Sequence, residues 1–265
     1  MDWKRIPLVV WILFAIDLVL CFSYLINYLI GEPYGLPTFQ LDLNGEKNIP
    51  TWYSSIKWFC LSVLFGIFAF RNIDYSRRKS WLLLFFPLLF LAFSVDEVAV
   101  IHEMLGSRLD QILLPTGNRA DTFFIVTGIW FFVLGIPVLL GCWFALSSLK
   151  IYFRNDAHFL KKFVTGLVIF FSGSIGIEAI SNLTESNKFS FVLGNFFEEI
   201  FEMVGVTVIL WAVYGLLATH GFCWNLDAVE KRGESSSSIP DFHGQVANPS
   251  GTDPRNNDFG SGTQT

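Results

Sequence analysis

Long, continuous runs of apolar residues dominate this chain, and most polar residues lie between them. A helix needs about 20 mainly apolar residues to cross the hydrocarbon core of a bilayer. Six runs are long enough, at approximately residues 7–30, 52–70, 81–103, 122–147, 160–182 and 196–219. The runs are continuous rather than alternating, so they predict helices and not barrel strands. The expected fold is therefore all-α, a polytopic bundle of six transmembrane helices.

The basic residues predict how this bundle is oriented. With a cytoplasmic N-terminus, 13 of the 18 Lys and Arg residues fall on the cytoplasmic side. The other side then holds the remaining 5, which are Lys47, Lys57, Arg108, Arg119 and Lys188. Cytoplasmic loops usually carry the excess of positive charge. We therefore expect both termini to be cytoplasmic.

Segments outside the six runs have patterns of their own. Residues 104–120 have apolar positions at helical spacing, which predicts an interfacial helix that continues the third span on the outer surface. A transmembrane domain of residues 1–230 is followed by residues 231–265, which are rich in Ser, Gly, Asn, Asp and Pro. Such a composition predicts a disordered cytoplasmic tail. Pro87 and Pro137 lie inside the third and fourth runs and predict kinks there.

Composition strengthens the membrane interpretation and excludes other classes. Hydrophobic residues make up 52% of the chain and charged residues only 15%, with a mean hydropathy of +0.50. Water-soluble domains devote about 25% of their residues to charge, so the lipid bilayer is the expected partner. The net charge of −5 and the lack of a basic stripe argue against a nucleic-acid partner. The four cysteines are isolated and predict neither a disulfide framework nor a cysteine metal site.

Several ionisable residues lie inside the predicted spans, where they are costly and usually functional. They come from three spans: Asp96, Glu97, His102 and Glu103 from the third, Glu178 from the fifth, and Glu198, Glu199 and Glu202 from the sixth. In the expected topology the third and fifth spans run outward and the sixth runs inward. All of these side chains therefore gather in the outer half of the membrane.

Seven carboxylates and one imidazole cannot all be ionised together in surroundings of low dielectric constant. Either some carboxyl groups are protonated, or cations neutralise them, with Lys57, Arg108 and Arg119 as the nearest basic residues. Glu and His are also a familiar ligand set for a divalent metal ion. We therefore predict a metal site, with the metal's identity open, formed by Asp96, His102, Glu103, Glu178, Glu199 and Glu202.

Two simpler interpretations stand beside this one. Glu103, Glu198 and Glu199 lie near predicted span ends, where a carboxylate in the headgroup region is merely solvated. Asp17, near the middle of the first span, suits either a proton path or a structural hydrogen bond to a neighbouring helix.

Two segments resemble motifs of a group of uncharacterised bacterial multi-pass membrane proteins. The run Ser94-Val95-Asp96-Glu97, four further residues and then His102-Glu103 resembles an S-x-D-E-x4-H-E motif. Residues 198–205 resemble an E-E-x2-E-M-x-G motif. The resemblance implies a bacterial inner (plasma) membrane location and supplies no reaction. Membrane desaturases and ceramidase-like hydrolases need several histidines, and only His102 is suitably placed here.

Three functions remain compatible with the sequence. We place first a metal-dependent membrane enzyme that acts on a lipid or hydrophobic substrate, with the cluster supplying metal ligands or a general base. The second is a proton- or cation-coupled transporter, in which the cluster forms an outer vestibule and Asp17 a relay. The chain shows no internal repeat of the kind that many transporters have, which counts against this second function. The third is a membrane scaffold or assembly protein whose acidic patch binds a partner.

Overall fold

The helices of this chain are long and apolar, as its hydropathy predicts. The computed structural model describes residues 6–31, 39–43, 45, 47–113, 131–150, 152–154, 156–181 and 188–221. Within these residues there is no strand, and six helices are long and apolar enough to cross a membrane. They are Leu8–Leu29, Ile49–Asn72, Ser80–Ala99, Phe132–Leu149, Ala157–Ile177 and Phe189–Thr219. The all-α fold and the six apolar helices are thus confirmed, while the expected tail lies outside the described residues.

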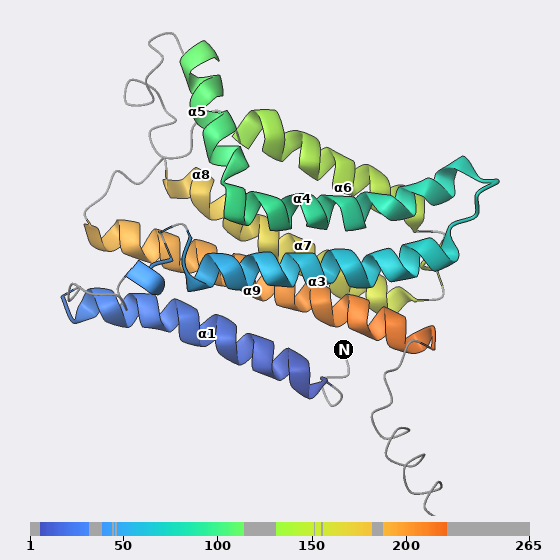
Figure 1. The fold of residues 1–265 in the computed structure, drawn as a ribbon, viewed down its shortest axis with the longest axis horizontal. Helices are drawn as coiled ribbons and strands as arrows, with labels where there is room; N and C mark the ends of the chain where they lie inside the picture. The colour runs from blue at the N-terminus through green and yellow to red at the C-terminus, as the bar shows by residue number, and fades with distance from the viewer. Residues whose placement is uncertain are drawn as a thin grey trace, which may run out of the picture. The chain divides into compact units, whose positions relative to one another are not determined.

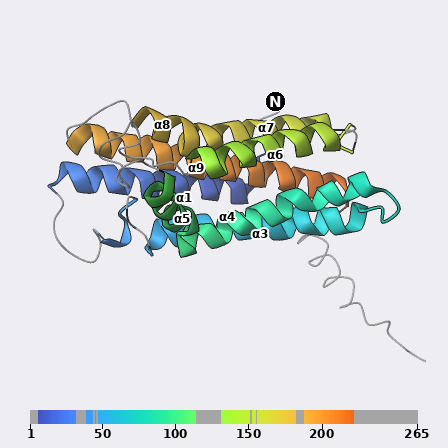
Figure 2. The same cartoon turned by 90° about the horizontal axis from the view of Figure 1, so that it is seen from above.

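Figure 1 shows the order of the elements, several of which change helix type along their length. They are α1 (Leu8–Leu29), α3 (Ile49–Asn72), the 3-10 helix η2 (Arg78–Leu84), α4 (Phe85–Ala99), α5 (Ile101–Leu113), the π-helix η4 (Phe131–Gly135), α6 (Ile136–Leu149), α7 (Ala157–Phe171), the π-helix η5 (Ser172–Ile177), α8 (Glu178–Ser181) and α9 (Lys188–Thr219). The central helix is α9, which packs against α1, α3 and α7, while α3 also packs against α4 (Figure 2).

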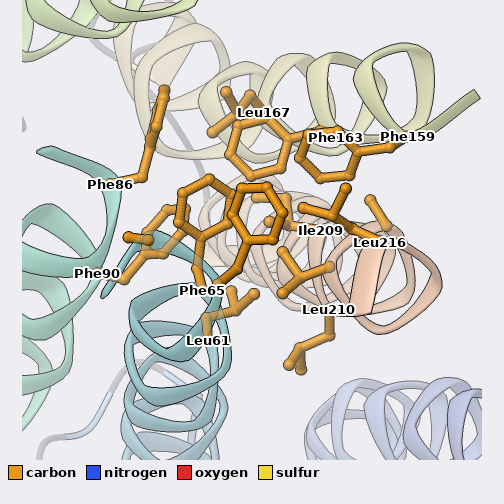
Figure 3. Close-up of a cluster of buried hydrophobic side chains, with 14 of the residues drawn as sticks. Leu61, Phe65, Phe86, Phe90, Phe159, Phe163, Leu167, Ile209, Leu210 and Leu216 are labelled. Atoms are coloured by element: carbon orange, nitrogen blue, oxygen red, sulfur yellow. The ribbon is translucent and has the colours of Figure 1, made fainter. Parts of the chain in front are cut away.

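Aromatic side chains fill the core between α3, α4, α7 and α9. In Figure 3 the side chains of these four helices point toward one another, with Phe65 of α3 and Phe163 of α7 among them. The ring centroids of Phe65 and Phe163 lie 5.8 Å apart, and those of Phe86 and Phe163 lie 5.0 Å apart in an edge-to-face arrangement. Such aromatic pairs add specific contacts to the apolar area they bury. The core therefore fixes how these four helices are placed.

The outer surfaces of the helices are apolar as well. The side chains of Leu88, Trp143 and Phe144 are 63%, 73% and 62% exposed. Water-soluble proteins rarely expose contiguous apolar patches of this kind, whereas a lipid-facing surface requires them. The exposed side chains thus support the conclusion that this is a multi-pass membrane protein.

Glycines bring α7 and α9 into close contact. A Cβ on Gly205 of α9 would lie 2.5 Å from the backbone nitrogen of Phe170, and one on Gly166 of α7 would lie 2.9 Å from the Gly205 carbonyl oxygen. Small residues let the backbones of membrane helices approach closely. One turn further along, Gly173 of η5 lies directly against Glu198 and Glu202 of α9. The glycines therefore also set the position of the acidic end of α9.

The two prolines lie where helix geometry changes rather than in the middle of a helix. Pro87 is the third residue of α4, which follows the 3-10 helix η2, and Pro137 is the second residue of α6, which follows the π-helix η4. The first turn of an α-helix has N–H groups without intrahelical partners, so a missing N–H costs little there. A change of helix type precedes each proline, and the kinks expected there stay a prediction.

Candidate functional site

A cavity of about 530 Å³ lies at the end of the bundle where α4 ends and α9 begins. Five of the six predicted site residues line it, namely Asp96, His102, Glu103, Glu199 and Glu202. Glu97, Glu198, Asn195 and Ser174 line it too. The side chain of the sixth predicted residue, Glu178, lies outside what the structure describes. The structure therefore brings the predicted residues of α4, α5 and α9 to one cavity, and their role as metal ligands stays a prediction.

The helix that carries this site breaks at Val100. Its backbone is left-handed, with φ 54° and ψ 39°, so α4 ends at Ala99 and α5 begins at Ile101. A β-branched residue rarely adopts this conformation, because its Cβ approaches the following carbonyl oxygen. The third span therefore ends at Ala99 rather than near residue 103, and the helix expected after it begins at Ile101, separated from α4 by this break. Asp96 and Glu103 belong to different helices and do not share one helix face.

The break brings His102 onto Asp96. The backbone N–H of His102 donates to Asp96 Oδ1 at 2.8 Å, and His102 Nδ1 lies 2.7 Å from Asp96 Oδ2. The carboxylate thus caps the start of α5 and orients the imidazole at the same time. When Nδ1 donates to the carboxylate, Nε2 is left as the basic nitrogen. Both side chains are partly exposed, at 35% and 28%, so the pair is accessible from the cavity.

The opposite wall of the cavity is the acidic face of α9. Glu198, Glu199 and Glu202 are spaced by one and three residues, which places them on one side of the helix. Glu198 interacts electrostatically with His102 across the cavity. The site therefore combines an oriented imidazole with several carboxyl groups, an arrangement suited to moving protons.

Two π-helical segments complete the wall. Leu134 and Gly135 of η4 and Ser174 and Ile175 of η5 all line the cavity. π-Helical turns are rare and often occur at functional sites. Hydropathy did not reveal these segments. The four Ser and Gly residues within 172–176 were the local sequence signal for η5.

Lys57, predicted to help neutralise the cluster, makes its hydrogen bonds elsewhere and interacts electrostatically with Glu97 of the cluster. It lies inside α3 with a side chain that is 2% exposed, and its Nζ donates to Asp17 Oδ1 at 2.7 Å and to the Met203 carbonyl at 3.0 Å. Thr207 Oγ1 donates to the other oxygen of Asp17 at 2.6 Å. Asp17 thus makes structural hydrogen bonds to neighbouring helices, one of the two roles that the sequence left open. Lys57 must also be removed from the count of outer basic residues.

The charge of the cavity lining is strongly negative. Its described residues include six carboxyl side chains and one imidazole, and neither Lys nor Arg. Among the side chains that the structure describes, no three of the His, Cys, Asp and Glu type are grouped closely enough to hold a metal ion. The metal site therefore stays a prediction, and the imidazole and carboxyl groups of the cavity are side chains that can transfer protons.

Comparison with known proteins gives one match. A family model described as Domain of unknown function (DUF8692) matches residues 8–218. This range includes both motif segments and the six apolar helices, except the last residue of the sixth. No curated protein and no solved structure matches the chain.

Proposed function

The chain belongs to the family described as Domain of unknown function (DUF8692), and we propose that it is a membrane enzyme acting on a lipid or another hydrophobic substrate. One observation carries the proposal: a single cavity holds the His102–Asp96 pair, the carboxyl groups of α9 and an apolar wall. Binding sites for small molecules are typically concave, mainly apolar and equipped with a few convergent polar groups. We therefore assign the proposed reaction to this cavity.

The chemistry we propose is general acid–base catalysis. His102 Nε2 takes a proton from water or from a substrate hydroxyl, while Asp96 orients the ring and stabilises the imidazolium that forms. A carboxyl group of Glu198 or Glu202 on the opposite wall returns a proton to the leaving group. This division of roles suits the hydrolysis of a bond near the polar head of an amphiphile.

A divalent metal ion remains part of the proposal. Glu103, Glu199, Glu202 and His102 offer oxygen and nitrogen donors around the cavity, and such a set can bind an ion that activates water. The carboxylates would have to turn toward one point to do so. Measurement of the metal content decides this part separately from the acid–base part.

We also propose that the protein lies in a bacterial inner membrane with both termini in the cytoplasm. The revised charge distribution supports this, because 13 basic residues fall on the inner side and 4 on the outer side when Lys57 is assigned to the bilayer, making up the 18 in all. In this orientation the cavity opens in the outer half of the membrane.

The test compares His102→Gln with the wild type in nanodiscs made from bacterial lipid extract. We expect the wild type to convert at least one lipid species, measured by mass spectrometry over time, and the variant to be at least about 100-fold slower, since general acid–base catalysis contributes factors of this order or more. Ser107→Ala, at an exposed position of α5 outside the cavity lining, serves as the control and should retain the wild-type rate.

Two results would contradict the proposal: no lipid converted by well-folded wild type, or equal rates for wild type and His102→Gln. The metal part is tested by elemental analysis of the same preparations. A bound divalent ion that disappears in Glu202→Ala and His102→Ala supports it. Wild-type protein that turns over lipid without bound metal contradicts it.

A further inference from the structure

The cavity is divided into an apolar inner half and an acidic outer half. Along α4, Leu89 and Phe93 precede Asp96, and along α7, Phe170 precedes Ser174 of η5. Both helices run toward the same end of the bundle, so on each of them the apolar lining comes first and the polar lining second. On α9, which runs in the opposite direction, the acidic residues lie near the start. The cavity is therefore itself amphipathic.

Aromatic rings form the floor of the inner half. Trp58 is 1% exposed, and its ring centroid lies 4.9 Å from that of Phe93 and 4.9 Å from that of Phe170. The rings of Phe93 and Phe170 lie 5.7 Å apart. Leu89 and Val138 continue this surface on either side. Such a surface suits a hydrocarbon chain and offers little to a polar group.

The outer half of the cavity determines which charge a bound head group can carry. Its described lining carries the carboxyl groups of Asp96, Glu97, Glu103, Glu198, Glu199 and Glu202 and no Lys or Arg. The nearby Lys57 donates hydrogen bonds from its Nζ to Asp17 and to the Met203 carbonyl, and its charge also interacts with Glu97. Like charges brought together in low-dielectric surroundings cost several kcal/mol, so a phosphate or sulfate head is disfavoured. An ammonium head is attracted by the carboxylates and by aromatic faces.

Small side chains form part of the lining between α4 and α6. A Cβ on Gly141 of α6 would lie 3.1 Å from Cζ of Phe85, so α6 and the start of α4 are tightly packed toward the inner end. Further along, Gly135 of η4, Val138 of α6 and Ala92 of α4 line the cavity, and Ala92 is exposed. A larger side chain at Ala92 would therefore reduce the space in the cavity on this side.

From these observations we infer that the substrate is a single-chain amphiphile with an ammonium head group, which binds in this cavity. Its chain lies against Trp58 and Phe93, and its head lies among the carboxyl groups of α9. The cavity volume of about 530 Å³ falls within the usual range for small-molecule sites, roughly 300–1,000 Å³. This inference rests on the proposed function for its reaction, but it concerns binding and is tested without turnover.

The experiment measures saturable binding of three twelve-carbon probes that differ in the head group. Radiolabelled dodecyltrimethylammonium, dodecylphosphocholine and dodecyl sulfate are each titrated into protein-loaded nanodiscs, with empty nanodiscs as background. We expect one saturable site for the ammonium probe, with a Kd at least about 10-fold lower than that of the phosphocholine probe, and no saturable binding of the sulfate. Equal affinities for the three probes would overturn the inference about the head group.

Matched variants test the place of binding. Ala92→Phe fills part of the cavity and should weaken binding of the ammonium probe at least about 10-fold, whereas Val95→Phe, on the same helix at a 48% exposed position outside the cavity, should not change it. The double variant Glu199→Gln/Glu202→Gln should weaken it as Ala92→Phe does. Wild-type affinity in both Ala92→Phe and the double variant would overturn the inference.

The outcomes separate this inference from the proposed function. The binding inference is judged on the wild type, Ala92→Phe and the Glu199→Gln/Glu202→Gln double variant, whereas His102→Gln is used only for turnover. A wild type that binds the probe specifically but converts no lipid contradicts the proposed enzyme and leaves the binding inference standing. A wild type that converts only lipids without a cationic head contradicts the binding inference and leaves the enzyme standing.

Discussion

His102 is oriented because a single carboxylate holds both its backbone and its ring. Asp96 accepts hydrogen bonds from the backbone N–H and pairs with Nδ1, at 2.8 Å and 2.7 Å. On a continuous α-helix two residues separated by six positions would lie about 120° apart around the axis, and this contact would not form. The left-handed Val100 between them makes it possible. One backbone conformation thus converts two scattered polar residues into an oriented pair.

The buried pair of Asp17 and Lys57 is the second feature of note at the scale of single residues. Their side chains are 0% and 2% exposed, and they join α1 to α3, while Thr207 and the Met203 carbonyl add α9. In lipid or in a protein core, an unpaired charge at such a position is far more costly than an apolar side chain. Each of the two side chains therefore needs the other to compensate its buried charge.

Replacement of one partner should consequently lower the free energy of unfolding much more than replacement of both. Lys57→Met is expected to lower the free energy of unfolding by about 3–5 kcal/mol, since it leaves Asp17 buried without its counter-ion. Asp17→Leu should have a similar effect, and Asp17→Leu/Lys57→Met should recover most of the loss. The measurement is the denaturation midpoint of each variant in the same detergent. A double variant whose loss equals the sum of the single losses would show that the two residues do not act as a pair.

Among the elements, the contact between α7 and α9 decides where the acidic wall lies. Gly166 and Gly205 let the two backbones approach, and Gly173 leaves room for α9 beside Glu198 and Glu202. The same helix, α7, continues into η5, whose wider turns bring Ser174 into the cavity. The position of the site therefore depends on the packing of α7 and η5 against α9, both beside the acidic residues and further along the helices.

Gly205→Ala tests this dependence. A methyl group there would lie 2.5 Å from Phe170 N, so the helices must separate, and overpacking of this kind costs typically about 1–3 kcal/mol. Gly215→Ala in the same helix is the control, because nothing lies within 4 Å of its Cβ, and it should leave stability unchanged or raise it by up to about 1 kcal/mol. Thermal unfolding in detergent measures both. Equal stability of the two variants would show that α7 and α9 are not closely packed at this point.

At the scale of the whole molecule, the question is which end of the bundle faces the cytoplasm. Arg77 and Arg78 lie in the connection between α3 and α4, at the opposite end from the cavity. The excess of basic residues at this end favours a cytoplasmic location. The cavity, α5 and the acidic start of α9 then belong to the outer side. Substrate drawn from the bilayer would enter at the level of the outer leaflet.

Cysteine labelling of intact cells checks the orientation. In a background with its native cysteines replaced, Lys47→Cys and Ser76→Cys introduce thiols at exposed positions at opposite ends of α3. A membrane-impermeant maleimide should label position 47 in intact cells and position 76 only after the inner membrane is permeabilised. Labelling of position 76 alone in intact cells would invert the proposed topology, and labelling of both would contradict six spans with a single orientation.

Hydropathy and charge were enough to predict the class of fold, the six apolar helices and the gathering of acidic residues at one end. This succeeds because lipid offers no hydrogen-bond partners, so each span must satisfy its backbone by itself and carries its own signal along the chain. Asp96, Glu199 and Glu202 reach one cavity because helix direction alternates, a consequence of the span count alone. The same reasoning misplaced Lys57, whose partner Asp17 is 40 residues away.

The finer features of the site depended on contacts that no local pattern encodes. Val100 gives no sign in sequence of its left-handed backbone, which sets α5 apart from α4 and turns His102 onto Asp96. The π-helical wall and the aromatic floor form where α3, α4, α6 and α7 meet, so their geometry follows from the packing of side chains distant in sequence. Local hydropathy decides that these helices form and in which direction they run, and packing decides what the space between them can hold.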